Sequence, residues 1–364
     1  MPDLRTLRIV EIGDKPYVKT AFPLQVAYFS TRGETVTNGG QAGAQRLSLA
    51  TLPSLLRALR DPGVALIVCH PTFHAPWQWQ AISRMIFNRR LLGRSFPLVP
   101  AFGPQVLRLG TAAPIAVVDH DDLPVINRQN RFLLERCAIY FKRELPCDRW
   151  RVFLKTSHAN LPTPRFRLQP RHARLLDKLH PISIGLPLSG YPACEPAASA
   201  VKDIDVFFAG RIDGSSTLRP GGLRELRALR EQGYAIDVAD RPMPREEFLR
   251  RCRRAWLCWS PEGLGWDCFR HYEVAACGSV PLINQPTIER HQPLLNGIHA
   301  IYYDAESGGL TRAAIAALSD KPALAAMAAA GREHVLRHHT SQALASYIVT
   351  TALAAAKRGT GGPQ

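Results

Sequence analysis

The feature that most constrains the fold is the stretch of residues 255–283, AWLCWSPEGLGWDCFRHYEVAACGSVPLI. AWLCWS has the composition of a short buried strand, PEGLG is a Gly-rich loop, and DCFRHYEVAAC has the composition and spacing of a helix. Gly278 ends that helix, and SVPLI is again a strand. A strand, a loop, a helix and a strand in so few residues predict a βαβ unit of an open parallel sheet.

The loop of this unit predicts a site for an anionic ligand. Open parallel sheets bind ligands at the carboxyl ends of their strands. The amides of the Gly-rich loop and of the helix N-terminus favour phosphate groups. Glu273 lies one to two turns into the helix, where its carboxylate can accept hydrogen bonds from sugar hydroxyls. The unit therefore predicts a nucleotide or nucleotide-sugar site.

The run GWDCFRHYEVAACGSVPLI resembles the donor-site segment of two-domain GT-B glycosyltransferases, especially the exostosin-like and bacterial family-1-like groups. In that segment a glutamate, which is followed by small residues, a glycine and a Val-Pro strand, holds the ribose of a nucleotide sugar. Glu273, Ala275, Ala276, Gly278 and Pro281 match this pattern. The resemblance implies an α/β fold with two Rossmann-like domains facing a cleft, and metal-independent glycosyl transfer.

The match departs from the family pattern at one position. Many retaining members carry a second glutamate eight positions before the first. Here that position is Gly265, and the nearest upstream glutamate is Glu262. The sequence therefore leaves open whether the anomeric centre is retained or inverted.

Length and composition suit two domains and argue against several other classes. The 364 residues, 46% hydrophobic and 21% charged, can form two α/β cores. No apolar run reaches the length of about 18 residues that a membrane span needs, and no apolar signal core opens the chain, so a cytoplasmic location is expected. The 8 cysteines include no Cys-x-x-Cys pair, which favours buried thiols over a zinc or redox motif.

The net charge of +16 raises the alternative of a basic nucleic-acid-binding protein. The basic residues are dispersed, and many lie among acids such as Glu225 and Glu246, as on the solvated faces of helices. No recognition helix or zinc finger accompanies them, so no specific nucleic-acid partner is expected. A basic surface equally suits an anionic donor, an acidic glycan or peripheral contact with the negative inner face of a membrane.

Continuous apolar runs that alternate with helical stretches predict a Rossmann-like, acceptor-side domain over residues 1–190. Its expected strands lie at residues 7–13, 26–30, 64–70, 114–122, 137–145 and 182–188. An amphipathic helix is expected at residues 49–61, and a linker rich in Pro, Gly, Ser and Ala at residues 191–202.

A second Rossmann-like domain, on the donor side, is expected over residues 203–340. Besides the βαβ unit, its expected elements are strands at 203–211, 235–240 and 299–305 and helices at 222–234 and 245–256. As in the GT-B fold, a last helix at residues 341–357 is expected to cross back to the first domain. Residues 358–364 are expected to be a disordered tail.

Four residues join Glu273 as candidates for the donor site. Gly210 and Arg211 end a strand, where the glycine would allow close backbone approach and the arginine would neutralise the donor diphosphate. The alternative is a turn glycine and a surface arginine. Arg270 and His271 open the helix of Glu273 and can face the diphosphate or the base. Their alternative is solvent exposure or helix packing.

Trp266 and Asp267, just before that helix, have two interpretations each. Trp266 can stack on a base or sugar, or be a buried aromatic residue. Asp267 is expected to cap the helix rather than to take part in catalysis. The hydroxyl-rich turn at residues 214–219 can bind phosphate or be a plain surface loop.

On the acceptor side, Asp119, His120, Asp121 and Asp122 follow an apolar strand. An inverting transferase needs one base there, and Asp119 or His120 is the candidate, with Asp121 contacting substrate. The alternative is a turn that caps the next segment. Such acids also suit magnesium or manganese. However, the Asp-x-Asp metal motif belongs to the other common transferase fold, so no metal is expected.

Lys142 and Arg143 follow the next strand and can bind acceptor or phosphate opposite Asp119, unless they form a surface ion pair. His70, at the end of another strand, is a second candidate base. The His70–His74 spacing invites a zinc site, but the prolines around it oppose a helix.

These observations together predict transfer of a sugar from a nucleotide sugar to a glycan, lipid-linked or protein acceptor, with domain closure excluding water. The runner-up is a nucleotide-sugar epimerase, because that activity shares the fold.

Overall fold

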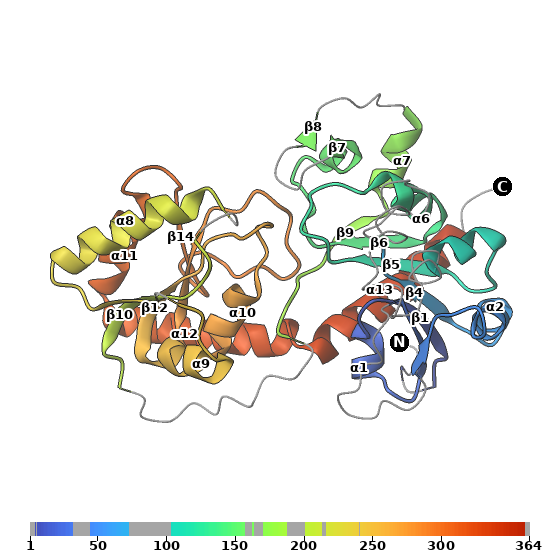
Figure 1. The fold of residues 1–364 in the computed structure, drawn as a ribbon, viewed down its shortest axis with the longest axis horizontal. Helices are drawn as coiled ribbons and strands as arrows, with labels where there is room; N and C mark the ends of the chain where they lie inside the picture. The colour runs from blue at the N-terminus through green and yellow to red at the C-terminus, as the bar shows by residue number, and fades with distance from the viewer. Residues whose placement is uncertain are drawn as a thin grey trace, which may run out of the picture. The chain divides into compact units, whose positions relative to one another are not determined.

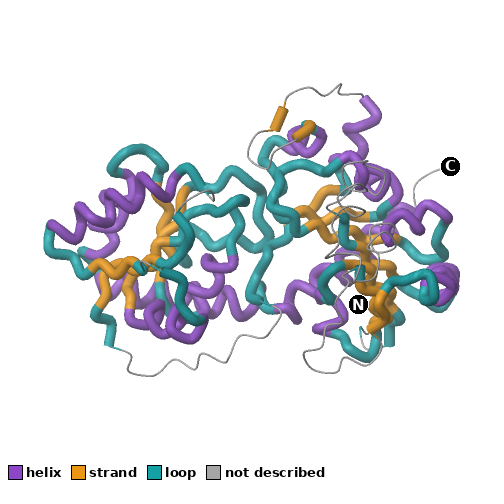
Figure 2. Tube along the Cα trace, in the orientation of Figure 1, coloured by secondary structure: helices purple, strands orange, loops and turns teal. Residues whose placement is uncertain are grey.

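The computed structural model describes residues 4, 6–31, 44–72, 103–156, 162–163, 170–187, 201–212, 216–239 and 241–360. The chain forms two compact α/β units (Figures 1 and 2). The N-terminal unit comprises Met1–Asp121, Val125–Ile182 and Ala345–Gln364, and the C-terminal unit comprises Asp122–Pro124 and Ser183–Leu344.

The described part of the N-terminal unit has a seven-stranded parallel sheet in the order β3-β2-β1-β4-β5-β6-β9. Its strands are β1 (Ile9–Gly13), β2 (Val26–Ser30), β3 (Ala44–Arg46), β4 (Leu66–Cys69), β5 (Ile115–Asp119), β6 (Ile139–Lys142) and β9 (Leu179–Pro181). Every residue of β1, β4, β5 and β6 is buried. This burial explains why their sequences are continuous apolar runs rather than alternating ones.

Helices and short elements complete the described part of the N-terminal unit. They are α1 (Tyr17–Ala21), α2 (Leu52–Arg60), α6 (Arg131–Arg136), α7 (Ala173–Leu176), the 3-10 helices Gly103–Leu109, Arg128–Asn130, Arg149–Phe153 and Pro170–His172, and the antiparallel pair β7 (Lys155–Thr156) and β8 (Pro162–Thr163). The predicted helix at residues 49–61 is confirmed by α2.

One predicted strand of the first domain, at residues 182–188, is wrong. The sheet ends at Pro181 of β9. Gly185 has a φ of 61°, in the left-handed region that a strand does not use. The amides on either side bond outside any sheet, Ile184 to the Asp267 carboxylate and Leu186 to the carbonyl of His339.

Among the described residues, the C-terminal unit has a five-stranded parallel sheet in the order β11-β10-β12-β13-β14. Its elements are β10 (Ile204–Phe208), α8 (Leu218–Glu231), β11 (Ile236–Val238), α9 (Arg245–Arg254), β12 (Ala255–Trp259), α10 (Phe269–Ala276), β13 (Val280–Asn284), β14 (Ile301–Tyr303), α11 (Gly309–Leu318) and α12 (Lys321–His338). The predicted βαβ unit is confirmed as β12, α10 and β13, with Gly278 left-handed (φ 75°) after the helix.

The last helix, α13 (Ser341–Thr360), begins in the C-terminal unit and belongs to the N-terminal unit from Ala345 onward. Within the N-terminal unit its Tyr347 ring packs edge-on against Phe141, and its hydroxyl donates to the carbonyl of Pro181. The helix continues to Thr360, past the predicted start of the tail at residue 358; residues 361–364 lie outside the described part.

None of the described helices is by itself long and apolar enough to cross a membrane. In the part of the chain that the structure describes, one pair of helices, α11 and α12, reaches such a length and composition when taken together, with a bend of 102° between them.

Candidate functional site

Arg219 links two loops at the carboxyl edge of the C-terminal sheet. It is the second residue of α8, and its side chain is 5% exposed. Nη1 donates to the carbonyl of Arg211, 2.6 Å away in the loop after β10, and Nε donates to the carbonyl of Glu262, 3.0 Å away in the loop after β12. A buried cation therefore lies where the sequence predicts the phosphate-binding loops.

Arg270, the second residue of α10, brings another guanidinium group to the same edge. A Cβ on Gly210 would lie 2.5 Å from its Nη2, so the absence of a side chain at Gly210 makes room for the arginine. The guanidinium carbon also lies over the Phe208 ring, 5.4 Å from its centre. Nη1 is buried and has no hydrogen-bond acceptor among the described residues.

The electrostatics of this edge favour an anion. Burial lowers the pKa of Arg270, and burial together with the nearby charge of Arg270 lowers the pKa of Arg219. Both shifts mean that the charged guanidinium groups are destabilised by loss of water and, for Arg219, by a like charge. A phosphate group between them would relieve that cost and satisfy Nη1 of Arg270.

Glu273 projects from α10 near these arginines. Its side chain is 13% exposed, and burial raises the pKa of its carboxyl group. Arg245, the first residue of α9, acts in the opposite direction through an ion pair of 3.4 Å between Nη2 and Oε1 of Glu273. The predicted sugar-binding carboxylate is thus part of a mostly cationic group.

The contacts of His271 favour the alternative of a helix-packing role over contact with the donor. Its side chain is 1% exposed, Nδ1 lies 2.8 Å from the Ser260 hydroxyl, and Nε2 lies 2.8 Å from the carbonyl of Trp266. Burial lowers its pKa to about 3. The ring is neutral, and its two hydrogen bonds hold both ends of the 260–266 loop to α10.

Trp266 and Asp267 are also structural. Trp266 is buried, and its Nε1 donates to the carbonyl of Asn284, which supports the reading as a buried aromatic residue. Asp267 does not cap α10, whose N-cap is Cys268. Its carboxylate instead accepts from the Tyr272 hydroxyl and the amide of Ile184, both at 2.6 Å.

The loop after β12 is further held by Asn284. The Asn284 side chain accepts from the amide of Glu262 and donates to the Glu262 carboxylate at 3.2 Å. Burial raises the pKa of Glu262. In the hydroxyl-rich turn, the Ser216 hydroxyl accepts from the amide of Leu218, and Ser215 lies outside the described residues.

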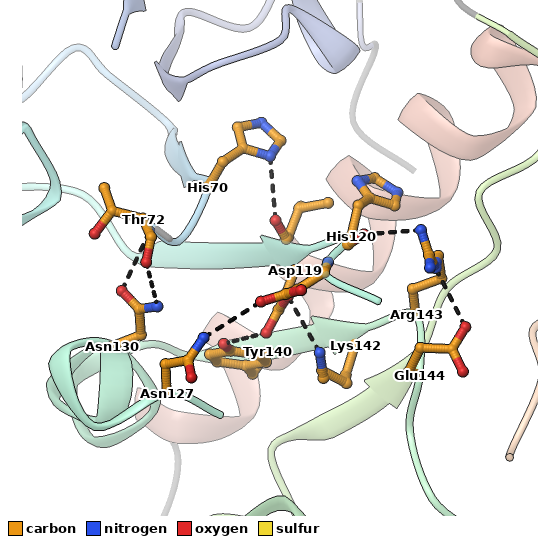
Figure 3. Close-up of polar contacts among 12 residues, drawn as sticks. His70, Thr72, Asp119, His120, Asn127, Asn130, Tyr140, Lys142, Arg143 and Glu144 are labelled. Atoms are coloured by element: carbon orange, nitrogen blue, oxygen red, sulfur yellow. Dashed lines mark hydrogen bonds and ion pairs between the residues drawn. The ribbon is translucent and has the colours of Figure 1, made fainter. Parts of the chain in front are cut away.

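In the N-terminal unit the predicted acceptor-side residues meet at the ends of neighbouring strands (Figure 3). Asp119 on β5 is 3% exposed. One carboxylate oxygen accepts from the amide of Asp121 and pairs with Nζ of Lys142 at 3.2 Å, and the other accepts from the Tyr140 hydroxyl at 2.7 Å. Both oxygens are engaged, so this arrangement does not suit the predicted catalytic base.

Lys142 and Arg143 form buried contacts rather than a surface pair. Lys142 is 0% exposed, which places its charge out of reach of an acceptor. Arg143 donates from Nη1 to the carbonyl of His120 and from Nε to Glu144. The ring of His120 stacks on Tyr17 at 4.2 Å, and Asp121 accepts from Asn127. The polar residues after β5 and β6 therefore brace one another's loops.

A buried network that the sequence did not predict lies beside this cluster. Glu11, in the middle of β1, is 0% exposed, and its carboxylate accepts from the amides of Val18 and Lys19 at the start of α1. Nε2 of His70 lies 3.0 Å from the same carboxylate, and Nδ1 lies 3.1 Å from the carbonyl of Val118. Both ring nitrogens of the second candidate base are therefore occupied. His74 lies outside the described residues.

Sequence reasoning missed Glu11, Arg219 and Arg245. A lone glutamate inside the apolar run IVEIG was a usable signal for Glu11. Arg219 and Arg245 had no such signal, because each stands among other arginines in a helix. No group of three or more His, Cys, Asp or Glu side chains in the described ranges is arranged to hold a metal ion.

Residues 250–350 match a family model described as glycosyl transferase-like. No curated protein sequence matches the chain. Among solved structures, sucrose-phosphate synthase from Thermosynechococcus elongatus is similar with a TM-score of 0.52 and 14% identity, over 98% of this chain and 100% of that one.

A UDP-forming trehalose-phosphate synthase from Burkholderia xenovorans is similar with a TM-score of 0.56 and 14% identity, over 98% and 100% of the two chains. An E. coli structure described as trehalose-6-phosphate bound with UDP-2-fluoro glucose has a TM-score of 0.54 and 12% identity, over 95% and 99%. At these identities the likeness concerns the fold, and it confirms the predicted class with two Rossmann-like domains.

Proposed function

We propose that this chain, a glycosyltransferase of the GT-B fold, takes its sugar from a UDP-sugar bound by the C-terminal unit. Its βαβ unit lies within the residues that match the glycosyl transferase-like model. Two similar structures name UDP, one as UDP-forming and one bound with UDP-2-fluoro glucose.

The observation that carries the proposal is the buried guanidinium group of Arg219 beside that of Arg270, a half-buried residue whose Nη1 is buried without an acceptor among the described residues. Glu273 lies close to Arg270. The diphosphate of the donor would bind between the arginines, which stabilise the negative charge of the departing UDP. Glu273 would accept hydrogen bonds from the ribose hydroxyls. Arg211 is exposed beside the same loop, and its side chain would add positive charge.

The acceptor is proposed to be a glycan, a lipid-linked glycan or a protein, bound by the N-terminal unit. Because the oxygens of Asp119 are engaged, His120 is the better candidate for the base that removes the acceptor proton. We further propose that transfer needs no metal, and that the protein acts in the cytoplasm beside the inner face of the membrane. The net charge of +16 supports that location.

The test is calorimetric titration of the purified chain with UDP, GDP, dTDP, ADP and CMP, with and without EDTA. Selective binding of UDP that EDTA does not change is expected. Glu273→Ala should weaken it about tenfold or more, through loss of charge-assisted hydrogen bonds. Glu246→Ala, which removes an exposed glutamate of α9, is the matched control and should bind as the wild type does.

Two results would overturn the donor site. One is the absence of binding to any nucleotide, with salt-sensitive binding to DNA or RNA instead. The other is equal UDP affinity in Glu273→Ala and the wild type. For the acceptor side, His120→Asn should abolish transfer while UDP affinity is unchanged, and unchanged transfer would exclude His120 as the base.

A further inference from the structure

The position of Arg245 in its helix is unfavourable for the helix itself. Arg245 is the first residue of α9, where the positive end of the helix dipole repels a cation. The next two residues, Glu246 and Glu247, are the acids that this position ordinarily favours. A cation at the start of α9 therefore points to a partner outside the helix.

That partner is Glu273 on α10. Nη2 of Arg245 lies 3.4 Å from Oε1 of Glu273, and the two side chains are 36% and 13% exposed. The pair joins the start of α9 to the middle of α10, and Nη2 of Arg245 is buried although its side chain as a whole is partly exposed. The Glu273 carboxylate is thus paired with a cation that comes from another helix.

We infer that Arg245 is a positioning residue for donor recognition, which holds the Glu273 carboxylate in the orientation that accepts hydrogen bonds from the ribose hydroxyls. This inference rests on the proposed function, because it assumes that Glu273 contacts the donor. It assigns no direct contact between Arg245 and the nucleotide.

The surroundings of Glu273 set the sign of a pH effect. Burial raises the pKa of Glu273, Arg245 on α9 lowers it most strongly, Cys277 on its own helix raises it, and Arg270 on that helix lowers it. The ligand-accepting form is the carboxylate, which is present above the folded-state pKa and lost as the pH falls through it. Without Arg245, the effect of burial raises the pKa of Glu273 further. The loss of binding on acidification should therefore begin at a higher pH.

The experiment measures UDP affinity by calorimetry from pH 5 to pH 8 for the wild type, Arg245→Met, Arg245→Lys, Glu273→Gln and Arg250→Met. In Arg245→Met the affinity for UDP should begin to fall at a higher pH than in the wild type. At the acid end of the range, the variant should bind roughly tenfold more weakly than the wild type for each unit by which the pKa of Glu273 rises. Arg245→Lys should restore most of the wild-type profile. Glu273→Gln should bind weakly and keep only the acid dependence that the UDP phosphate itself contributes, with no step that responds to Arg245.

Arg250→Met is the matched control. Arg250 lies on the same helix, is exposed, and pairs with Glu247 rather than with Glu273. Its removal costs α9 an arginine and an ion pair but should leave the pH profile of UDP binding as in the wild type.

The outcomes separate the two proposals. If Glu273→Gln weakens UDP binding but Arg245→Met keeps the wild-type affinity and pH profile, the role of Arg245 is overturned and the donor site stands. An equal change in Arg250→Met would also overturn it, because the effect would then belong to α9 as a whole. If the wild type does not bind UDP, or Glu273→Gln binds as the wild type does, both proposals fall.

Discussion

At the carboxyl edge of the N-terminal sheet, acids and bases meet in pairs: Asp119 with Lys142, Glu144 with Arg143, and Glu11 with His70. At the corresponding edge of the C-terminal sheet, Arg219 and Arg270 lie near each other, and Glu262 and Glu273 are their nearby acids. Arg270 keeps a buried N–H group with no acceptor in the described part of the chain, whereas Nζ of Lys142, which also has no hydrogen bond there, is paired with the Asp119 carboxylate.

Both edges are rich in charge, yet the balance of charge differs. Paired groups compensate each other's charge and stabilise loops, whereas an excess of cations with little access to water favours an anionic ligand. Charged residues at the end of a parallel strand are therefore poor evidence for a site until their partners are known. The experiments below test whether the first edge supports stability and the second supports binding.

The largest effect is expected from Lys142→Met. It leaves the buried Asp119 carboxylate without its cation, which typically costs about 3–5 kcal/mol in the free energy of unfolding. The loss should appear in urea denaturation of the whole chain. The double variant Asp119→Asn, Lys142→Met should recover much of it, since no unpaired charge is left. Stability equal to the wild type in Lys142→Met would show that this pair does not support the fold.

Arg270→Met should weaken ligand binding rather than stability. UDP affinity should fall about tenfold to a hundredfold, as expected for loss of a hydrogen bond between charged groups. The free energy of unfolding should stay the same or rise, because a buried guanidinium group with an unsatisfied N–H is removed. Calorimetry and urea denaturation on the same sample would check both. A large loss of stability with unchanged UDP affinity would mean that Arg270 supports the fold rather than ligand binding, against the distinction drawn between the two edges.

Acid should weaken the C-terminal unit through its buried histidines. Burial lowers the pKa of both His271 and His339 to about 3. A depressed folded-state pKa means that their stabilising contribution is complete above the unfolded pKa of about 6.5 and is lost as the pH falls from there toward 3. Near pH 5 the loss reaches about 2 kcal/mol for each ring.

The measurement is the free energy of unfolding by urea at several pH values between 7 and 5. His271→Gln lacks one of the titrating rings, so its stability should depend less steeply on pH than that of the wild type. An equally steep dependence in His271→Gln would mean that this ring is not neutral in the folded protein.

The smallest effect is expected from Arg254→Ala. Arg254 pairs with Asp203 at the surface of the C-terminal unit, where water screens the charges. Neither the unfolding midpoint nor UDP affinity should change measurably. A clear change in either quantity would mean that exposed charges matter as much as buried ones, so that burial does not explain the difference between the two edges.

Much of the fold follows from the sequence. The runs predicted as strands at residues 26–30 and 255–260 coincide with β2 and β12, because a strand that is buried at four of its five positions is mostly apolar. The stop at Gly278 follows from its left-handed backbone, and Glu273 lies on the predicted helix. The strand predicted at 182–188 failed because its apolar residues serve the C-terminal unit, where Ile184 and Leu186 join the core beside Tyr272.

The sequence by itself determined that parallel strands end in polar loops, and that Glu273 and Arg270 share one short helix. Only the tertiary structure decided which charges are neutralised. Lys142 reaches Asp119 from the neighbouring strand, and Arg219 and Arg245 come from other helices toward the loops and α10. Hydrophobic patterning is local and periodic, so it can be read along the chain. The balance of charge at a site depends on side chains from distant segments, and no local pattern encodes which of them meet.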